Sequence, residues 1–215
     1  MRLHLSPQAA AALLTSAALF SSCTLNPHRV DLAYPPQTIE NTRVSETSFA
    51  KPTPIAVELF EDLRRSRDVI GETRNAWMMH TGEVKASDPV ADWMRRALSL
   101  ELEDGNFGVT GPENTGSPPL ALYGEVDVVA SSKRKSTDAV VQFTVKLKRG
   151  FKILFTRAYR GVATLTPEAR RLLETELGDS VDPFGEALAQ ALSNAAAPLA
   201  SDLRAALRRE AGIDN

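Results

Sequence analysis

The stretch DAVVQFTVKLK, residues 138–148, decides the fold of this chain. From Val141 to Leu147 every second residue is apolar, and the residues between them are polar. Because successive side chains of a strand point to opposite faces, this alternation predicts a strand with one buried face. Residues 120–131 and 151–162 carry similar patterns on either side, and Arg149-Gly150 predicts a tight hairpin. We therefore predict a meander of three antiparallel strands.

Two long amphipathic helices are predicted to cover this sheet. In residues 89–104, apolar residues recur every three or four positions, Asp88 caps the start and Gly105 ends the helix. A second helix begins near Pro183, and Pro198 predicts a kink or break around residues 194–198. A shorter helix is expected over 166–177. An α+β fold follows: a two-layer sandwich with a mainly antiparallel sheet and two long amphipathic helices on one face.

The amino-terminal segment predicts export and a lipid anchor. Residues 9–20 are apolar but too few to span a bilayer as a helix, as in a signal peptide. Small residues precede Cys23, the only cysteine, and the run 19–23 resembles the lipobox of bacterial lipoproteins. That resemblance implies cleavage of residues 1–22 and a covalent lipid on Cys23. We expect no other cofactor, and no metal because the spacing of zinc ligands is absent. With Thr24 next, it also implies the outer membrane. The alternative is an ordinary secretory signal that leaves a free thiol.

The composition of the remaining residues predicts a tether, one domain and a short tail. Residues 23–53 are rich in Pro, Thr, Ser and Asn, which predicts a lipidated cysteine followed by a flexible tether. Residues 54–210 are predicted to form one periplasmic domain, and residues 211–215 a tail. A net charge of −2, with acidic and basic residues interspersed, argues against nucleic-acid binding.

The order of predicted elements resembles the YajG-like family of small bacterial outer-membrane lipoproteins. Three stretches carry the resemblance: residues 55–64 followed by Ile70-Gly71, residues 90–105 with 107–109, and residues 122–126. It implies a fold similar to those of ABC-transporter auxiliary lipoproteins and of the amino-terminal domain of TolB. It transfers no catalytic residue.

No pattern of nucleophile, base or metal ligands indicates an enzyme. His80 is the only histidine within the predicted domain, and neither a Gly-x-Ser-x-Gly motif nor a glycine-rich phosphate loop occurs. A catalytic site would require His80 to meet the acids of the charged segment that follows the first strand.

That charged segment, residues 61–74, is predicted to be a loop. It is either a solvated loop with internal ion pairs or a binding loop for an acidic partner or anionic lipid. If it is solvated, reversing its arginines to Glu leaves folding nearly unchanged. The candidate residues are Glu61, Asp62, Arg64, Arg65 and Arg67.

The run Trp77-Met78-Met79 also has two interpretations. Core packing beneath the helix 89–104 is the favoured one, and an adaptable binding patch is the alternative. The basic turn at residues 132–137 carries the same ambiguity between solvated charge and a binding surface.

These observations predict a non-enzymatic periplasmic lipoprotein. We expect it to be anchored to the outer membrane and to serve as a binding or scaffolding component of an envelope complex. The alternative is an auxiliary lipoprotein of an ABC transporter or of a lipid or lipopolysaccharide transport system, which predicts an apolar cavity between helices and sheet. An envelope protein is the expected partner, and the oligomeric state is left open.

Overall fold

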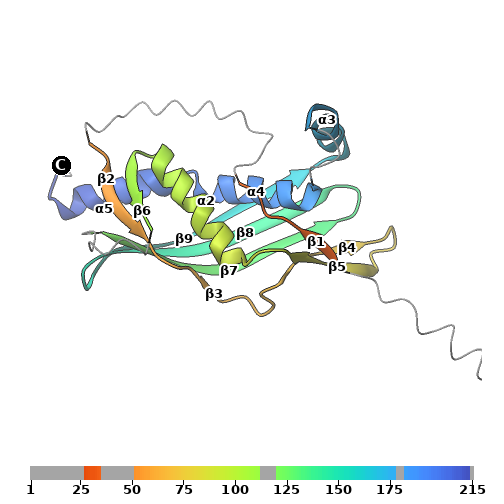
Figure 1. Cartoon of the computed structure of the whole chain (residues 1–215), viewed down its shortest axis with the longest axis horizontal. Helices are drawn as coiled ribbons and strands as arrows, with labels where there is room; N and C mark the ends of the chain where they lie inside the picture. The colour runs from red at the N-terminus through yellow and green to blue at the C-terminus, as the bar shows by residue number, and fades with distance from the viewer. Residues whose placement is uncertain (1–26, 35–50, 112–119, 178–181, 214–215) are drawn as a thin grey trace, which may run out of the picture.

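A computed structural model describes residues 27–34, 51–111, 120–177 and 182–213. The fold is α+β: helices cover one face of a nine-stranded open sheet, as predicted (Figure 1). The strands are β1 (His28–Val30), β2 (Thr53–Val57), β3 (Glu61–Asp62), β4 (Val69–Arg74), β5 (His80–Ala86), β6 (Phe107–Thr110), β7 (Ala121–Lys133), β8 (Thr137–Arg149) and β9 (Lys152–Leu165). The helices are α2 (Val90–Asp104), α3 (Pro167–Leu177), α4 (Pro183–Ala196) and α5 (Leu199–Glu210).

The antiparallel meander β7-β8-β9 forms as predicted. Every second residue of β8 from Val141 to Leu147 is fully buried against the helices. One detail of β7 differs from the prediction. Strict alternation from Val126 predicts that Val128 lies on the buried face. A bulge between Val126 and Val128 shifts the alternation, so that Val129 lies opposite Val141 there instead. The bulge re-aims the side chains of the second half of β7.

The sheet is mixed because a single interrupted strand runs parallel to β7. Strands β2, β3 and β4 pair with β7 in succession, at Leu122, Val126 and Ser131 among other positions. Strand β6 then pairs with β2, and β5 pairs with β4. The prediction of a continuous loop over residues 61–74 is therefore wrong, because both ends of that segment belong to the sheet.

Helices α2, α4 and α5 lie on the same face of the sheet (Figure 1). Pro198 separates α4 from α5, which confirms the predicted break. Helix α4 approaches β9 very closely at Gly161. A Cβ atom on Gly161 would lie 2.0 Å from the carbonyl oxygen of Ala191, so only glycine fits there.

The fold begins earlier than predicted. Strand β1 pairs in parallel with β5, and Val30 and Leu32 are buried. The indole nitrogen of Trp93 also donates a hydrogen bond to the carbonyl oxygen of Ala33, at 3.1 Å. The predicted tether over residues 23–53 is therefore wrong for residues 28–34, which are part of the domain. Cys23 and the predicted leader 1–22 lie outside the described residues.

Candidate functional site

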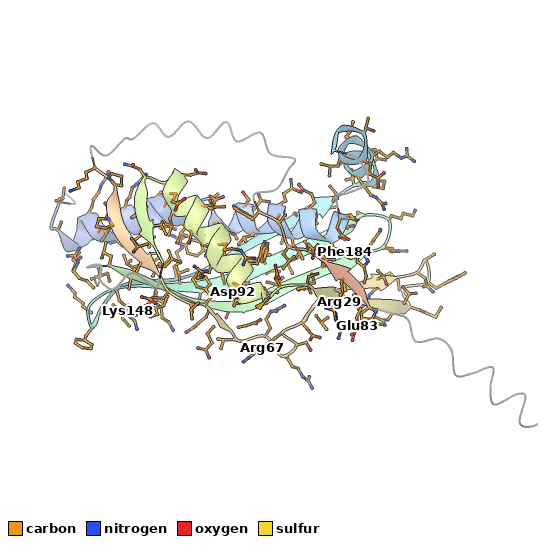
Figure 2. All side chains as sticks on the ribbon, viewed as in Figure 1. Arg29, Arg67, Glu83, Asp92, Lys148 and Phe184 are labelled. Carbon is orange, nitrogen blue, oxygen red and sulfur yellow. The ribbon has the colours of Figure 1, made fainter. Side chains whose placement is uncertain are left out.

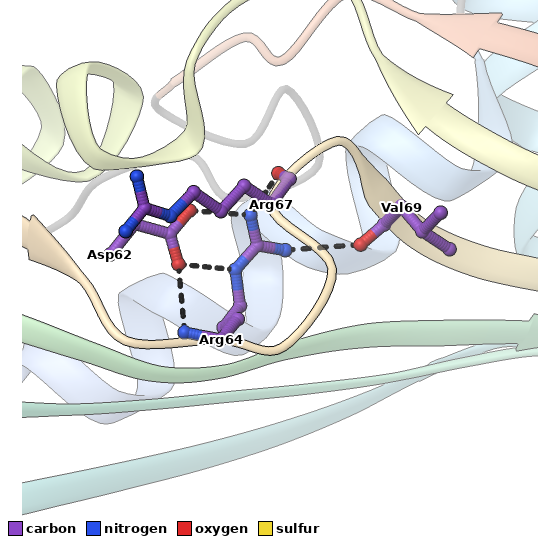
Figure 3. A network of polar contacts seen from close by, with 4 residues as sticks. All are labelled: Asp62, Arg64, Arg67 and Val69. Carbon is purple, nitrogen blue, oxygen red and sulfur yellow. Dashed lines mark hydrogen bonds and ion pairs between the residues drawn. The ribbon is translucent and has the colours of Figure 1, made fainter.

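The charged segment after β2 is held together by a shielded ion pair. The side chains of Arg64 and Asp62 are only 6% and 10% exposed. The guanidinium Nε and Nη2 of Arg64 lie 2.9 and 2.8 Å from the two carboxylate oxygens of Asp62. Figure 3 shows Arg64 also donating to the carbonyl oxygens of Val69, at 3.1 Å, and of Arg67. The pair therefore ties β3 to the start of β4.

The environment of Asp62 favours its charged form. Burial acts to raise the pKa of Asp62, but hydrogen bonds from the side chain and backbone of Arg64, with the charges of Arg64 and Arg67, outweigh it and lower the pKa. Arg64 and Asp62 are thus structural residues. The prediction that reversing the arginines leaves folding unchanged assumed exposed charges, and that assumption is wrong for Arg64.

The other members of the charged segment stay at the surface. Glu61, Arg65 and Arg67 are exposed, and these three residues remain available to a partner. The charged segment thus contains both a buried brace and solvated charges.

The run Trp77-Met78-Met79 lies in the turn between β4 and β5, and its side chains point into solvent. They are 80%, 49% and 57% exposed, so the prediction of core packing is wrong. The side-chain oxygen of Asn75 accepts hydrogen bonds from the backbone N–H groups of Trp77 and Met79, each at 3.0 Å. Residues 75–79, the hairpin turn, therefore present three large apolar side chains from a braced backbone.

The hairpin turn lies beside the basic turn that joins β7 to β8. Thr73, near the end of β4, pairs with Lys133, the last residue of β7. Arg134 and Lys135 then follow in the connection and are exposed. Lys133 lies over the ring of Phe184 at 5.8 Å, and burial lowers its pKa. The two exposed cations are thus next to the apolar turn.

His80 does not meet Glu61 or Asp62, the two acids at the start of the charged segment. His80 opens β5 and pairs with Arg74, close to the position of Lys133 on β7. Asp62 pairs with Val126, seven positions earlier on β7, which is about 23 Å at a strand rise of about 3.3 Å. Within the described ranges no three His, Cys, Asp or Glu side chains gather as a metal site.

A groove of about 540 Å³ is lined by residues of β4, β7, β8 and β9 and by no residue of the helices, so it lies on the face of the sheet that the helices leave open. Its centre is a row of apolar residues across three strands, since Val140 pairs with Ala130 on one side and Val162 on the other. Val162 is 59% exposed. Glu72 and Asp138 belong to its lining. The groove is on the opposite face from the cavity that the transport alternative predicts.

Comparison with known proteins identifies the fold. No family model matches the sequence, and no curated protein matches it. The DUF330 protein XCC0632 from Xanthomonas campestris is similar in structure: the TM-score is 0.53, the identity 13%, and the match covers 86% of this chain and 96% of that one.

Two further solved structures are more distant. PelC from Paraburkholderia phytofirmans, solved as a dodecamer, matches with a TM-score of 0.42 and 13% identity over 71% of this chain and 92% of its own. Lipoprotein GNA1162 from Neisseria meningitidis matches with a TM-score of 0.33 and 12% identity over 59% and 95%. Neither score supports a functional argument. The likeness to the Xanthomonas protein shows a shared fold, and the resemblance to the YajG-like family stays a prediction.

No helix of the described part of the chain is long and apolar enough to cross a membrane.

Proposed function

We propose that this chain is a non-enzymatic lipoprotein of the bacterial cell envelope, attached to the outer membrane through a lipid on Cys23. Its domain would lie in the periplasm and bind another envelope protein. The observation that carries the proposal is where the fold begins. Every described strand and helix comes after Cys23, and β1 starts five residues later. Removal of residues 1–22 would therefore leave the whole sheet intact.

The short stretch between Cys23 and β1 limits how far the domain can lie from the membrane. Five residues span at most about 17 Å when fully extended. The lipid would therefore hold the domain against the bilayer, whereas the tether expected from composition would have allowed a reach of about 100 Å.

The open face of the sheet supports the binding role. The apolar row Ala130-Val140-Val162 lies in a groove, and charged residues of β4 and β8 contribute to its lining. Apolar surface with a polar rim is typical of protein-binding sites. A partner that covers this face would bury Val162, which the isolated chain leaves largely in water.

The anchor is tested by metabolic labelling with a lipid precursor in the native host. Wild-type chain should be labelled and should fractionate with outer membranes, and Cys23→Ala should be unlabelled. Cys23→Ser serves as a conservative control and should also be unlabelled. Equal labelling of wild type and Cys23→Ala would overturn the assignment of the anchor to this residue.

The binding surface is tested by crosslinking in intact envelopes. Val162→Glu should fold normally and reduce capture of the partner, because a charge would enter the apolar row. Leu100→Glu, on the exposed side of α2, is the matched control and should capture the partner as wild type does. Equal capture by all three chains would exclude the groove as the site. Capture of an ABC-transporter subunit would support the auxiliary role instead of a general scaffold.

A further inference from the structure

We propose that the hairpin turn, together with Arg134 and Lys135, is a second and non-covalent contact with the membrane to which Cys23 is attached. Trp77, Met78 and Met79 would enter the interfacial region, and the two cations would lie against anionic lipid headgroups. This inference rests on the proposed anchor and adds an orientation to it: one end of the sheet faces the lipid.

The direction of β1 defines that end. Since β1 runs parallel to β5, the chain enters the sheet from the end at which β5 begins. His28 lies opposite Val84, four positions or about 13 Å beyond His80. The hairpin turn directly precedes His80. His28 lies five positions after Cys23, so an extended connection of about 17 Å reaches the level of the hairpin turn.

The basic turn lies at the same end. Strand β4 runs parallel to β7, and Thr73 pairs with Lys133, so both strands finish together. Figure 1 shows β1, β4 and β5 side by side at one end of the sheet, and the labels of Arg29 on β1 and Glu83 on β5 mark that end in Figure 2. The chain entry, the apolar turn and the two cations therefore share one end of the molecule.

The side chains of the hairpin turn suit a membrane interface. Trp is enriched at the boundary between headgroups and acyl chains, and Met is apolar and adaptable. The two hydrogen bonds from the backbone to Asn75 hold this turn in shape before contact. Less conformational entropy is then lost on binding than for an unbraced loop.

Charge at this end also favours an anionic surface. Neither Arg134 nor Lys135 belongs to an ion pair among the described residues, and each basic residue near an anionic membrane contributes about 1 kcal/mol. Several acids at this end lie against cations or a histidine. Glu72 pairs with Arg74 at 2.6 Å, Lys85 lies 2.8 Å from Asp68 and 3.8 Å from Glu83, and Asp182 lies 2.5 Å from His28. Asp138, directly after the basic turn, is exposed and accepts a hydrogen bond from Thr164.

The length of the connection favours lipid over a protein as the occupant. His28 lies within about 17 Å of Cys23, and the hairpin turn lies about 13 Å from His28, towards the end from which the chain enters the sheet. Cys23 and the turn are therefore about 30 Å apart at most, and much closer where the connection runs along β5. This short reach, together with the two exposed cations, favours lipid as the occupant.

Quenching of tryptophan fluorescence by brominated lipids tests the contact. The chain from Cys23 onward, which is the proposed mature form, is coupled through Cys23, its only thiol, to a maleimide lipid in vesicles of phosphatidylcholine and phosphatidylglycerol. We expect the emission of Trp77 to be quenched and the quenching to disappear in Trp77→Phe. Trp93 is 1% exposed and serves as the internal control that lipid does not reach. Reversing both cations, Arg134→Glu with Lys135→Glu, should reduce the quenching, most strongly at low salt.

The outcomes separate this inference from the proposed anchor. Chemical coupling attaches Cys23 to lipid in vitro, whether or not cells lipidate this residue. Metabolic labelling tests only whether cells lipidate it. If the coupled chain shows no quenching of Trp77, the hairpin turn does not touch lipid and the inference is wrong, even where labelling succeeds. Quenching that survives in Trp77→Phe would also overturn it, because the signal would then come from Trp93 in a disturbed fold.

Discussion

The segment 61–69 and the hairpin turn 75–79 differ in burial from what their compositions suggest: the charged segment contains a shielded ion pair, and the apolar turn is exposed to water. The first is dense in charge, yet its Arg64-Asp62 pair is nearly shielded from water and ties two strands together. The second is apolar, yet Trp77 is among the most exposed large side chains of the molecule. Polarity predicts burial only when the position in the fold allows it. Here both ends of the charged segment, β3 and β4, pair with β7, and the apolar turn lies beyond the ends of β4 and β5.

Reversal of Arg64 should produce the largest effect of any change that tests this contrast. Arg64→Glu would leave Asp62 without its partner and bring two carboxylates together in a shielded site. Removing one partner of a fully buried pair costs about 3–5 kcal/mol. The Arg64-Asp62 pair is partly buried, so we expect a smaller loss that still lowers the urea midpoint clearly. The neighbouring Arg65→Glu, at an exposed position, should leave the midpoint unchanged. Equal midpoints for the two variants would mean that the shielded pair does not brace the fold.

Measuring the stability of wild type and Asp62→Asn over a range of pH should test whether the charge of Asp62 stabilises the fold. The folded chain holds the pKa of Asp62 below its usual value of 3.8, so the carboxylate stabilises the fold above that value. This stabilisation is lost as the pH falls through the lowered pKa. The stability gap between wild type and Asp62→Asn should therefore be constant from neutral pH down to about 4 and should close in stronger acid. A gap that stays the same at every pH would contradict the role of the charge.

A smaller, local effect is expected at the hairpin turn. Asn75→Ala removes the acceptor of two backbone hydrogen bonds, each contributing about 1 kcal/mol. Hydrogen exchange at the amides of Trp77 and Met79 should become faster, while the global unfolding midpoint changes little. Asn75→Asp keeps the acceptor oxygen and should exchange as wild type does. Unchanged exchange in Asn75→Ala would show that other contacts shape the turn.

The sequence alone predicts the parts of the fold that depend on local periodicity. Three features depend only on residues close together in the sequence: the alternation in β8, the amphipathic pattern of α2 and the break at Pro198. Strand β1 could not be predicted in this way. Its three residues are too few to show a periodic pattern of apolar residues, and its partner β5 is more than fifty residues away in the sequence. The bulge in β7 is missed for a related reason, since a strand pattern assumes strict alternation.

The candidate site likewise has features that the sequence predicts and features that it does not. The importance of Asp62, Arg64, Trp77 and their neighbours could be recognised from residue type, but their burial could not. Burial of Arg64 depends on β3 and β4 both pairing with β7, which is a long-range event. One local signal was available for the hairpin turn. Asn75 precedes Trp77 by two residues, and Asn side chains commonly accept hydrogen bonds from backbone groups two positions later in turns.

The central claim, that an apolar turn is exposed while the core is filled from elsewhere, is tested most directly by acrylamide quenching of the two tryptophans. Wild type should contain one readily quenched tryptophan and one protected one, corresponding to Trp77 and Trp93. Trp77→Phe should lose the quenched class and keep both the protected emission and the unfolding midpoint. A protected Trp77, or a Trp77→Phe chain that unfolds far more easily than wild type, would contradict the account.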